Sequence, residues 1–123
     1  MSHMTDLKTK ITLKEKAWLE EALRSLSHLG LSFTYSDGEN RYRVHYKPIE
    51  KYHAENLSFT WQQDHYQAVG DSYLVDRELR EVMGLIEGKY TDEMIKGYAE
   101  TQGFMIEDEI IRDSERSLVM VRY

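Results

Sequence analysis

The residues best suited to chemistry are four cationic or titratable side chains at every second position of one segment: Arg41, Arg43, His45 and Lys47. In a β-strand, residues at alternate positions face the same side and lie about 7 Å apart. Guanidinium, imidazole and ammonium groups in one row can bind a phosphate or a carboxylate. We therefore predict a strand here with an anion-binding site on one face. Tyr46, on the opposite face of this strand, is included in the predicted ligand-binding set.

Two other interpretations of this row need no ligand. Its side chains can form an ordinary solvated face of a sheet. They can also form ion pairs across the sheet with Glu107 and Glu109 of a later strand. All three interpretations place the row on a strand, and the sequence does not choose among them.

The middle of the chain is rich in tyrosine, a residue enriched at interfaces because it buries a large area yet keeps a polar tip. The chain has nine tyrosines and two tryptophans. The polar segment 49–56 is predicted to be a mobile loop. We predict that this loop and the neighbouring strands form a partner-binding surface made of Tyr52, His53, His65 and Tyr66. The alternative place for the aromatic side chains is the core of the sheet.

Three histidines could meet on a metal ion together with Asp64 or Glu55: His45, His53 and His65. Imidazole and carboxylate groups are suitable ligands, but the spacings are irregular and no helix-borne histidine pair is present. We therefore predict surface histidines and no metal site.

Acid–base catalysis would need a carboxylate or a histidine in an apolar pocket that moves its pKa toward neutrality. Asp64, His65 and Asp71 flank the aromatic strand predicted at 57–61, so a cleft there would suit this chemistry. The sequence contains no G-x-S-x-G serine motif and no glycine-rich phosphate loop. We assign no catalytic residue and predict no cofactor.

The spacing of the apolar residues predicts these elements in chain order: a strand at 4–11, a helix from Thr12 to Gly30, hairpins at 31–47 and 57–70, helices at 76–88 and 91–102, and strands at 104–111 and 118–123. Thr12 and Glu15 have the spacing of a capping box that begins the first helix, and Gly30 is placed to end it. Gly88 is expected to divide the two later helices. We predict an α+β fold with a single antiparallel β-sheet of about six to seven strands and two or three helices packed on one face.

Length and composition exclude several classes of protein. The 123 residues fit a single domain, residues 1–123, with one modest core. The formal net charge of −6 argues against bulk nucleic-acid binding, and the lack of cysteine excludes disulfides and thiolate nucleophiles. No segment approaches the roughly 20 apolar residues that cross a bilayer. We predict a soluble, intracellular protein that does not bind membranes.

Several segments, in the same order, resemble one known family: MSHMTDLKTKI, HLG, FTWQQDHYQAVGD, KYTDEMIKGYAETQGF and LVMVRY. The chain resembles the hypothetical chloroplast reading frame thirty-five family, also called domain of unknown function twelve fifty-seven. It departs from the family pattern at Tyr123, where a tryptophan is expected, and residues 39–56 contain none of the shared segments. The resemblance implies a fold and a cytoplasmic location, which is the stroma for a plastid protein and the host cytoplasm for a phage protein. It implies no activity and no catalytic residue.

We predict a small, non-enzymatic binding or adaptor domain that holds a protein partner or a small anionic ligand through its central strands and the loop 41–56. The alternative is an enzyme that acts on a small anionic substrate, with Arg43 and His45 binding it and His65 or Asp64 as acid or base. Sequence-specific nucleic-acid binding ranks third because of the net charge. The segment LVMVRY, as an edge strand, can pair with a second copy in a homodimer.

Overall fold

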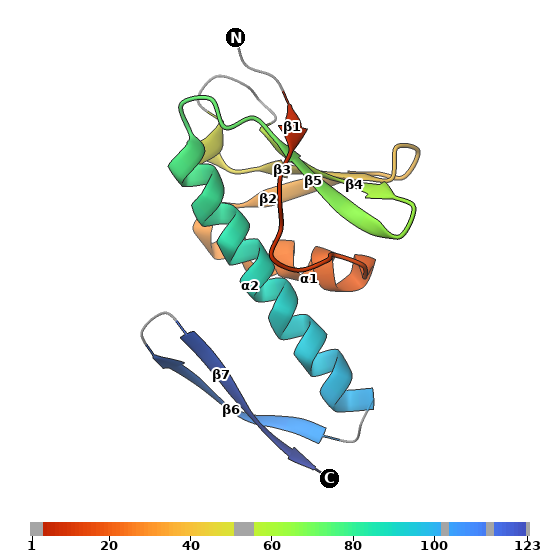
Figure 1. The fold of residues 1–123 in the computed structure, drawn as a ribbon, viewed down its shortest axis with the longest axis vertical. Helices are drawn as coiled ribbons and strands as arrows, with labels where there is room; N and C mark the ends of the chain where they lie inside the picture. Colours follow the sequence, from red (N-terminus) through yellow and green to blue (C-terminus); the bar gives the residue numbers. More distant parts are fainter. Residues whose placement is uncertain (1–3, 51–55, 102–103, 113–114, 123) are drawn as a thin grey trace. The chain divides into compact units, whose positions relative to one another are not determined.

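The structure is a computed structural model that describes residues 4–50, 56–101, 104–112 and 115–122, with only the backbone for the last two ranges. The chain forms two compact units, residues 1–90 and residues 91–123, and each is described by itself. The elements (Figure 1) are β1 (Thr5–Asp6), α1 (Lys16–Ser25), η1 (Ser27–Leu29), β2 (Ser32–Ser36), β3 (Arg41–His45), η2 (Lys47–Ile49), β4 (Leu57–Gln62), β5 (His65–Gly70), α2 (Asp76–Thr101), β6 (Phe104–Arg112) and β7 (Glu115–Arg122). In the described ranges, neither helix has the length and apolar character needed to cross a membrane.

Five strands form one antiparallel sheet in the order β1-β5-β4-β3-β2, so β3 is an internal strand. The predicted α+β class and antiparallel pairing are confirmed. The prediction of one sheet with six to seven strands is wrong, because β6 and β7 pair with each other in a separate two-stranded sheet. The predicted homodimer through the last strand stays a prediction, as does the single domain.

The first strand is much shorter than the predicted 4–11. β1 pairs with the end of β5, and the Leu7 amide still donates to the Ala68 carbonyl at 2.8 Å. The chain then leaves the sheet edge and returns at Leu13, whose carbonyl accepts the Tyr66 amide at 2.7 Å. The segment bows away from β5 between these two points. Leu7 and Ile11 are the partly buried side chains that hold it against the core.

Helix α1 begins at Lys16, and the predicted capping box is wrong. Glu15 occupies the N-cap position, and its side chain makes no capping hydrogen bond. Instead, the buried hydroxyl of Tyr90 accepts the backbone amides of Lys14 and Glu15, each at 2.9 Å. Gly30 ends the helical region as predicted, because it follows η1 with a φ of 87° that glycine adopts without strain.

Helix α2 runs without a break through Gly88, so the predicted division of this region into two helices is wrong. Glycine weakens a helix interior by about 1 kcal/mol relative to alanine. In the first unit that cost is outweighed by burial of one helix face, which contributes Leu79, Val82 and Ile86 to the core.

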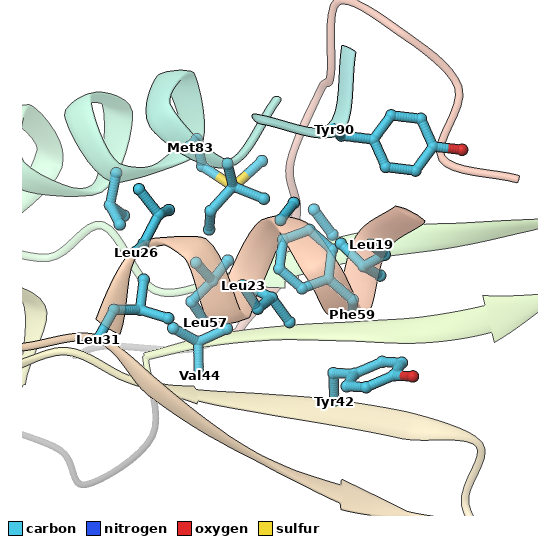
Figure 2. Packing of buried hydrophobic residues seen from close by; sticks show 14 of the residues in the cluster. Leu19, Leu23, Leu26, Leu31, Tyr42, Val44, Leu57, Phe59, Met83 and Tyr90 are labelled. Carbon is cyan, nitrogen blue, oxygen red and sulfur yellow. The ribbon is translucent and has the colours of Figure 1, made fainter. Parts of the chain in front are cut away.

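The core of the first unit lies between one face of the five-stranded sheet and the two helices. Figure 2 shows Leu19 and Leu23 of α1, and Leu26 directly after it, among side chains of the sheet such as Leu57 and Phe59. All five side chains are at most 1% exposed. The opposite face of the sheet carries polar side chains, and the candidate site lies there.

Candidate functional site

The three charged or titratable side chains of β3 face away from the core. Tyr42 and Val44 of the same strand are completely buried, so Arg41, Arg43 and His45 point to the outer face of the sheet. We call these three residues the arginine row. The alternation predicted for this segment is therefore present, and each member of the row is only half-buried.

Hydroxyl side chains flank the arginine row on both neighbouring strands. Arg43 lies opposite Thr34 of β2 and Ser58 of β4. The remaining hydroxyl residues paired with the row are Ser32 and Ser36 of β2 and Thr60 of β4. Sequence reasoning missed these residues, although both flanking strands contain the triplet S-F-T. A hydroxyl group is a neutral hydrogen-bond donor and a guanidinium group is a charged one. Side by side, both can donate to the same bound anion.

Two carboxylates of nearby loops hold the arginine row in place. Glu39 Oε2 lies 2.6 Å from Arg43 Nη2 and 3.7 Å from Arg41 Nη1, and its side chain is 52% exposed. His45 Nδ1 lies 3.5 Å from Glu50 Oε1, and its Nε2 lies 3.2 Å from the Thr34 hydroxyl. The arginine row therefore does form ion pairs, and those described here are with carboxylates close to it in the sequence.

The alternative interpretation, in which the row pairs across one sheet with Glu107 and Glu109, is wrong. Both glutamates belong to β6, which pairs with β7 in the separate two-stranded sheet. The two strands beside β3 are β2 on one side and β4 on the other. No strand carrying these carboxylates therefore lies beside the arginine row in its sheet.

Ser58 has an unusual environment for a residue on the outer face. Its side chain is fully buried, and its hydroxyl has no hydrogen-bond partner among the residues that the structure describes. A buried polar group without a partner costs about 1–3 kcal/mol. A bound molecule would remove this cost if it displaced the side chains that cover Ser58 and supplied an acceptor directly opposite Arg43.

The other residues predicted in the ligand-binding set are not part of this row. Strand β3 ends at His45, and Lys47 begins the short helix η2, where it is exposed. Tyr46 is partly buried and packs against the core, as its place on the opposite face implies. The candidate site therefore consists of the arginine row and the hydroxyl residues beside it, without Tyr46 and Lys47.

The four predicted partner-binding residues do not form one surface in the described part of the chain. Tyr52 and His53 lie outside the described residues, as does most of the predicted loop. Tyr66 is 3% exposed and its ring packs edge-on against Tyr42 and Trp61, so the prediction that it contacts a partner is wrong. His65 does face outward, at the start of β5.

His65 forms a close pair with Asp64 at the rim of an open cleft. His65 Nδ1 lies 2.7 Å from Asp64 Oδ1, and this hydrogen bond holds the pKa of Asp64 below its ordinary value. The cleft has a volume of about 630 Å³ and extends to Asp6, Thr9 and Thr12 of the N-terminal segment. His65 is on β5, two strands from β3, so the structure separates it from Arg43 and His45.

The other predicted acid and metal ligands do not join this pair. Asp71 is buried, accepts the Tyr73 amide at 3.0 Å, and is not among the residues that line the cleft. The described residues contain no group of three histidines and carboxylates that could hold a metal ion. His53 and Glu55 lie outside those residues.

Two buried tyrosines on the core face of the sheet are expected to make the stability of the fold sensitive to alkaline pH. Burial, together with the hydrogen bond that its hydroxyl donates to Glu20 at 2.6 Å, raises the pKa of Tyr42. Burial first, and then the neighbouring Tyr35 and Glu20, raise the pKa of Tyr66 from 10.0 to about 12. Both side chains therefore keep their protons in the folded protein at a pH that ionises them in the unfolded chain.

We expect the free energy of unfolding to fall as pH rises above about 10, because only the unfolded chain then releases the tyrosine protons. Tyr66 alone should account for a loss of about 2–3 kcal/mol by pH 12. Urea unfolding between pH 8 and pH 11.5 measures this slope. Tyr42→Phe should give a shallower slope than wild type, and equal slopes would contradict the assignment.

Comparison with known proteins places the chain in one family. The family model described as "Protein of unknown function (DUF1257)" matches residues 31–119. The chain belongs to this family. The DUF1257 match begins just before β2 and includes the arginine row and both flanking hydroxyl strands. No curated protein and no solved structure matches the chain.

Proposed function

We propose that this DUF1257 protein is a small binding domain that holds an anionic group of a ligand or partner on the outer face of its five-stranded sheet. The arginine row supplies the charge, and the hydroxyl residues of β2 and β4 supply further donors. A phosphate or carboxylate fits this set because each of its oxygens accepts hydrogen bonds from guanidinium and hydroxyl groups. The proposal is for binding without catalysis.

The buried hydroxyl of Ser58 is the observation that carries the proposal. It lacks a partner among the described residues and sits opposite Arg43 on an internal part of the sheet. Ordinary solvated faces have their hydroxyls in contact with water, whereas Ser58 is fully buried. A ligand oxygen that displaced the side chains now covering Ser58 would give this hydroxyl an acceptor beside Arg43.

Glu39 supports the proposal as a built-in competitor for the site. Its carboxylate already occupies a position that a ligand anion would take, 2.6 Å from the Arg43 guanidinium. Because its side chain is half exposed, the carboxylate can move into water when a stronger anion arrives. A dianionic phosphate attracts two guanidinium groups more strongly than one exposed carboxylate does.

Substitutions on either side of this ion pair test the proposal. Arg43→Gln should weaken binding of inorganic phosphate at least about tenfold, the effect of losing one charge-assisted hydrogen bond. Glu39→Gln removes the competitor and should strengthen binding. Arg77→Gln is the matched control, because Arg77 is 79% exposed and pairs with Glu78 on α2. Affinities come from calorimetric titration at low and high salt.

Two outcomes of these titrations would contradict the proposal. One is phosphate binding by Arg43→Gln that equals wild type and the Arg77→Gln control. The other is weaker binding by Glu39→Gln, which would mean that Glu39 assists the ligand rather than competing with it. Binding must also weaken at high salt, because exposed charge contacts are screened there.

Acid–base catalysis is the second candidate, and the 2.7 Å contact between Asp64 and His65 favours it. A carboxylate that orients an imidazole is a recurring arrangement around a general base. It ranks second because Asp64 is 80% exposed and the pair is distant in the sheet from the arginine row. This candidate requires a turnover that His65→Gln abolishes, and turnover unaffected by that change would remove it.

The subfamily and the cellular location are also proposals. Within the DUF1257 family, we infer that the chain is a relative of the hypothetical chloroplast reading frame thirty-five proteins. The inference rests on the shared sequence segments, which occur in the same order in both. A cytoplasmic or stromal location goes with that inference. Immunodetection in fractionated source cells tests it, and recovery outside that compartment would refute it.

A further inference from the structure

A cavity of about 420 Å³ lies between the N-terminal segment and the first turns of α2. Its apolar lining includes Leu7, Leu79 and Met83, and its charged lining includes Lys8 and Lys10. No residue of the arginine row contributes to it. We propose that this cavity is a second binding site, which takes a small apolar molecule with one anionic group, such as a medium-chain carboxylate.

The apolar floor of the cavity is firmly held by the core. Its volume falls within the range of about 300–1,000 Å³ that is usual for small-molecule sites. Leu79 and Met83 are 3% and 7% exposed and belong to the core cluster, while Leu7 packs against that cluster. Methionine adjusts its shape to irregular apolar ligands. The apolar part of the lining is therefore held in place by the core, and Met83 can adjust to a ligand chain.

Gly84 leaves the cavity open at a position where a side chain would normally stand. It lies inside a 26-residue helix, where glycine is less favourable than alanine. A Cβ added there would meet no atom within 4 Å, so close packing does not explain the glycine. Gly88, one turn further on, has equally open surroundings but does not line the cavity. Keeping the cavity open accounts for the glycine at position 84.

The charges around the cavity favour an anion. Its lining contains the three cations Lys8, Lys10 and Arg80 but only the two carboxylates Asp76 and Glu87. Both carboxylates have protein partners, because Asp76 pairs with Arg80 at 2.9 Å and Glu87 accepts the Lys10 backbone amide at 2.5 Å.

The lysine side chains are the groups that remain for a ligand. Within the described part of the chain, neither the Lys8 nor the Lys10 ammonium group has an ion-pair partner. A neutral apolar molecule would leave both ammonium groups unused, and a polyanion such as a nucleotide would leave the apolar floor unused. A single anionic head on an apolar chain uses both features.

Titration of the full-length, ¹⁵N-labelled protein with decanoate tests this proposal, with decanol as the neutral comparator. We expect decanoate to shift the amide resonances of the cavity residues, including Leu7, Leu79 and Gly84, and decanol to bind about tenfold more weakly. The double substitution of Lys8 and Lys10 by glutamine should reduce decanoate affinity to that of decanol.

Two leucine substitutions separate occupancy of the cavity from folding. Gly84→Leu should abolish decanoate binding while raising the melting temperature by several degrees, because leucine favours helix formation. Gly88→Leu should raise the melting temperature similarly and bind decanoate like wild type. Because both variants are expected to fold more stably than wild type, lost binding in only one of them reports the cavity.

The proposal is overturned if decanoate perturbs no cavity residue in wild type, or if Gly84→Leu binds it like wild type. It is also overturned if decanol binds as tightly as decanoate. Phosphate binding to the arginine row is measured in the same samples. Because the two sites share no residue, failure of one proposal leaves the result for the other readable.

Discussion

Gly70→Val is expected to lower the free energy of unfolding by about 3 kcal/mol, and Gly70→Ala by about 1–2 kcal/mol. Gly70 is buried where β5 meets both β1 and β4, opposite Thr5 and Leu57. A Cβ added at this position would lie 2.6 Å from Leu7 Cδ1 and 3.0 Å from the Asn56 carbonyl oxygen. Leu7 can yield by turning its side chain, but the backbone at Asn56 cannot yield without moving a strand.

Urea unfolding of the two variants measures these costs, with Gly84→Ala as the control. An added Cβ meets nothing within 4 Å at Gly84, so this change should stabilise the protein by about 0.5–1 kcal/mol through helix propensity. Gly70 does not have a positive φ, so alanine is allowed by its backbone and the whole cost is steric. Equal stability of Gly70→Ala and wild type would show that the close approach does not exist.

Tyr90→Phe is expected to cost about 2 kcal/mol, because it removes the single acceptor of two backbone amides at the start of α1. The Tyr90 hydroxyl accepts the amides of Lys14 and Glu15, each at 2.9 Å, and the Glu15 side chain provides no cap. The ring stays in place in the variant, since its edge-on contact with Trp18 at 5.8 Å does not involve the hydroxyl. The loss therefore reports the cap alone.

Thermal and urea unfolding of Tyr90→Phe measure this loss, and Tyr73→Phe is the control at a tyrosine that is 49% exposed. The control should change stability by less than about 0.5 kcal/mol. If Tyr90→Phe behaves like the control, water replaces the hydroxyl without cost and the tertiary cap contributes nothing.

The strands of the five-stranded sheet could largely be predicted because their signal is local. Alternation of apolar and polar residues, interrupted by short polar turns, is enough to predict the hairpins β2–β3 and β4–β5. The start of α1 could not be predicted, because Tyr90 lies 75 residues after Glu15. A helix cap supplied from that distance leaves no trace in the local sequence, and the Thr12–Glu15 spacing suggested a different one.

The candidate site was predictable along one strand and not across the sheet. The every-second-residue spacing of Arg41, Arg43 and His45 predicted which side chains share a face. Which strands lie on either side of them depends on strand order and register, which single-sequence patterns do not contain. For that reason ion pairs with Glu107 stayed open as an alternative, and Ser58 was missed.

Amide resonance mapping of the wild-type protein during titration with inorganic phosphate shows whether an anion binds to the outer face of the sheet. We predict saturable shifts confined to the outer face around Thr34, Arg43 and Ser58, and their loss in Arg43→Gln. Shifts that leave these three residues unchanged while other parts of the first unit respond would contradict it.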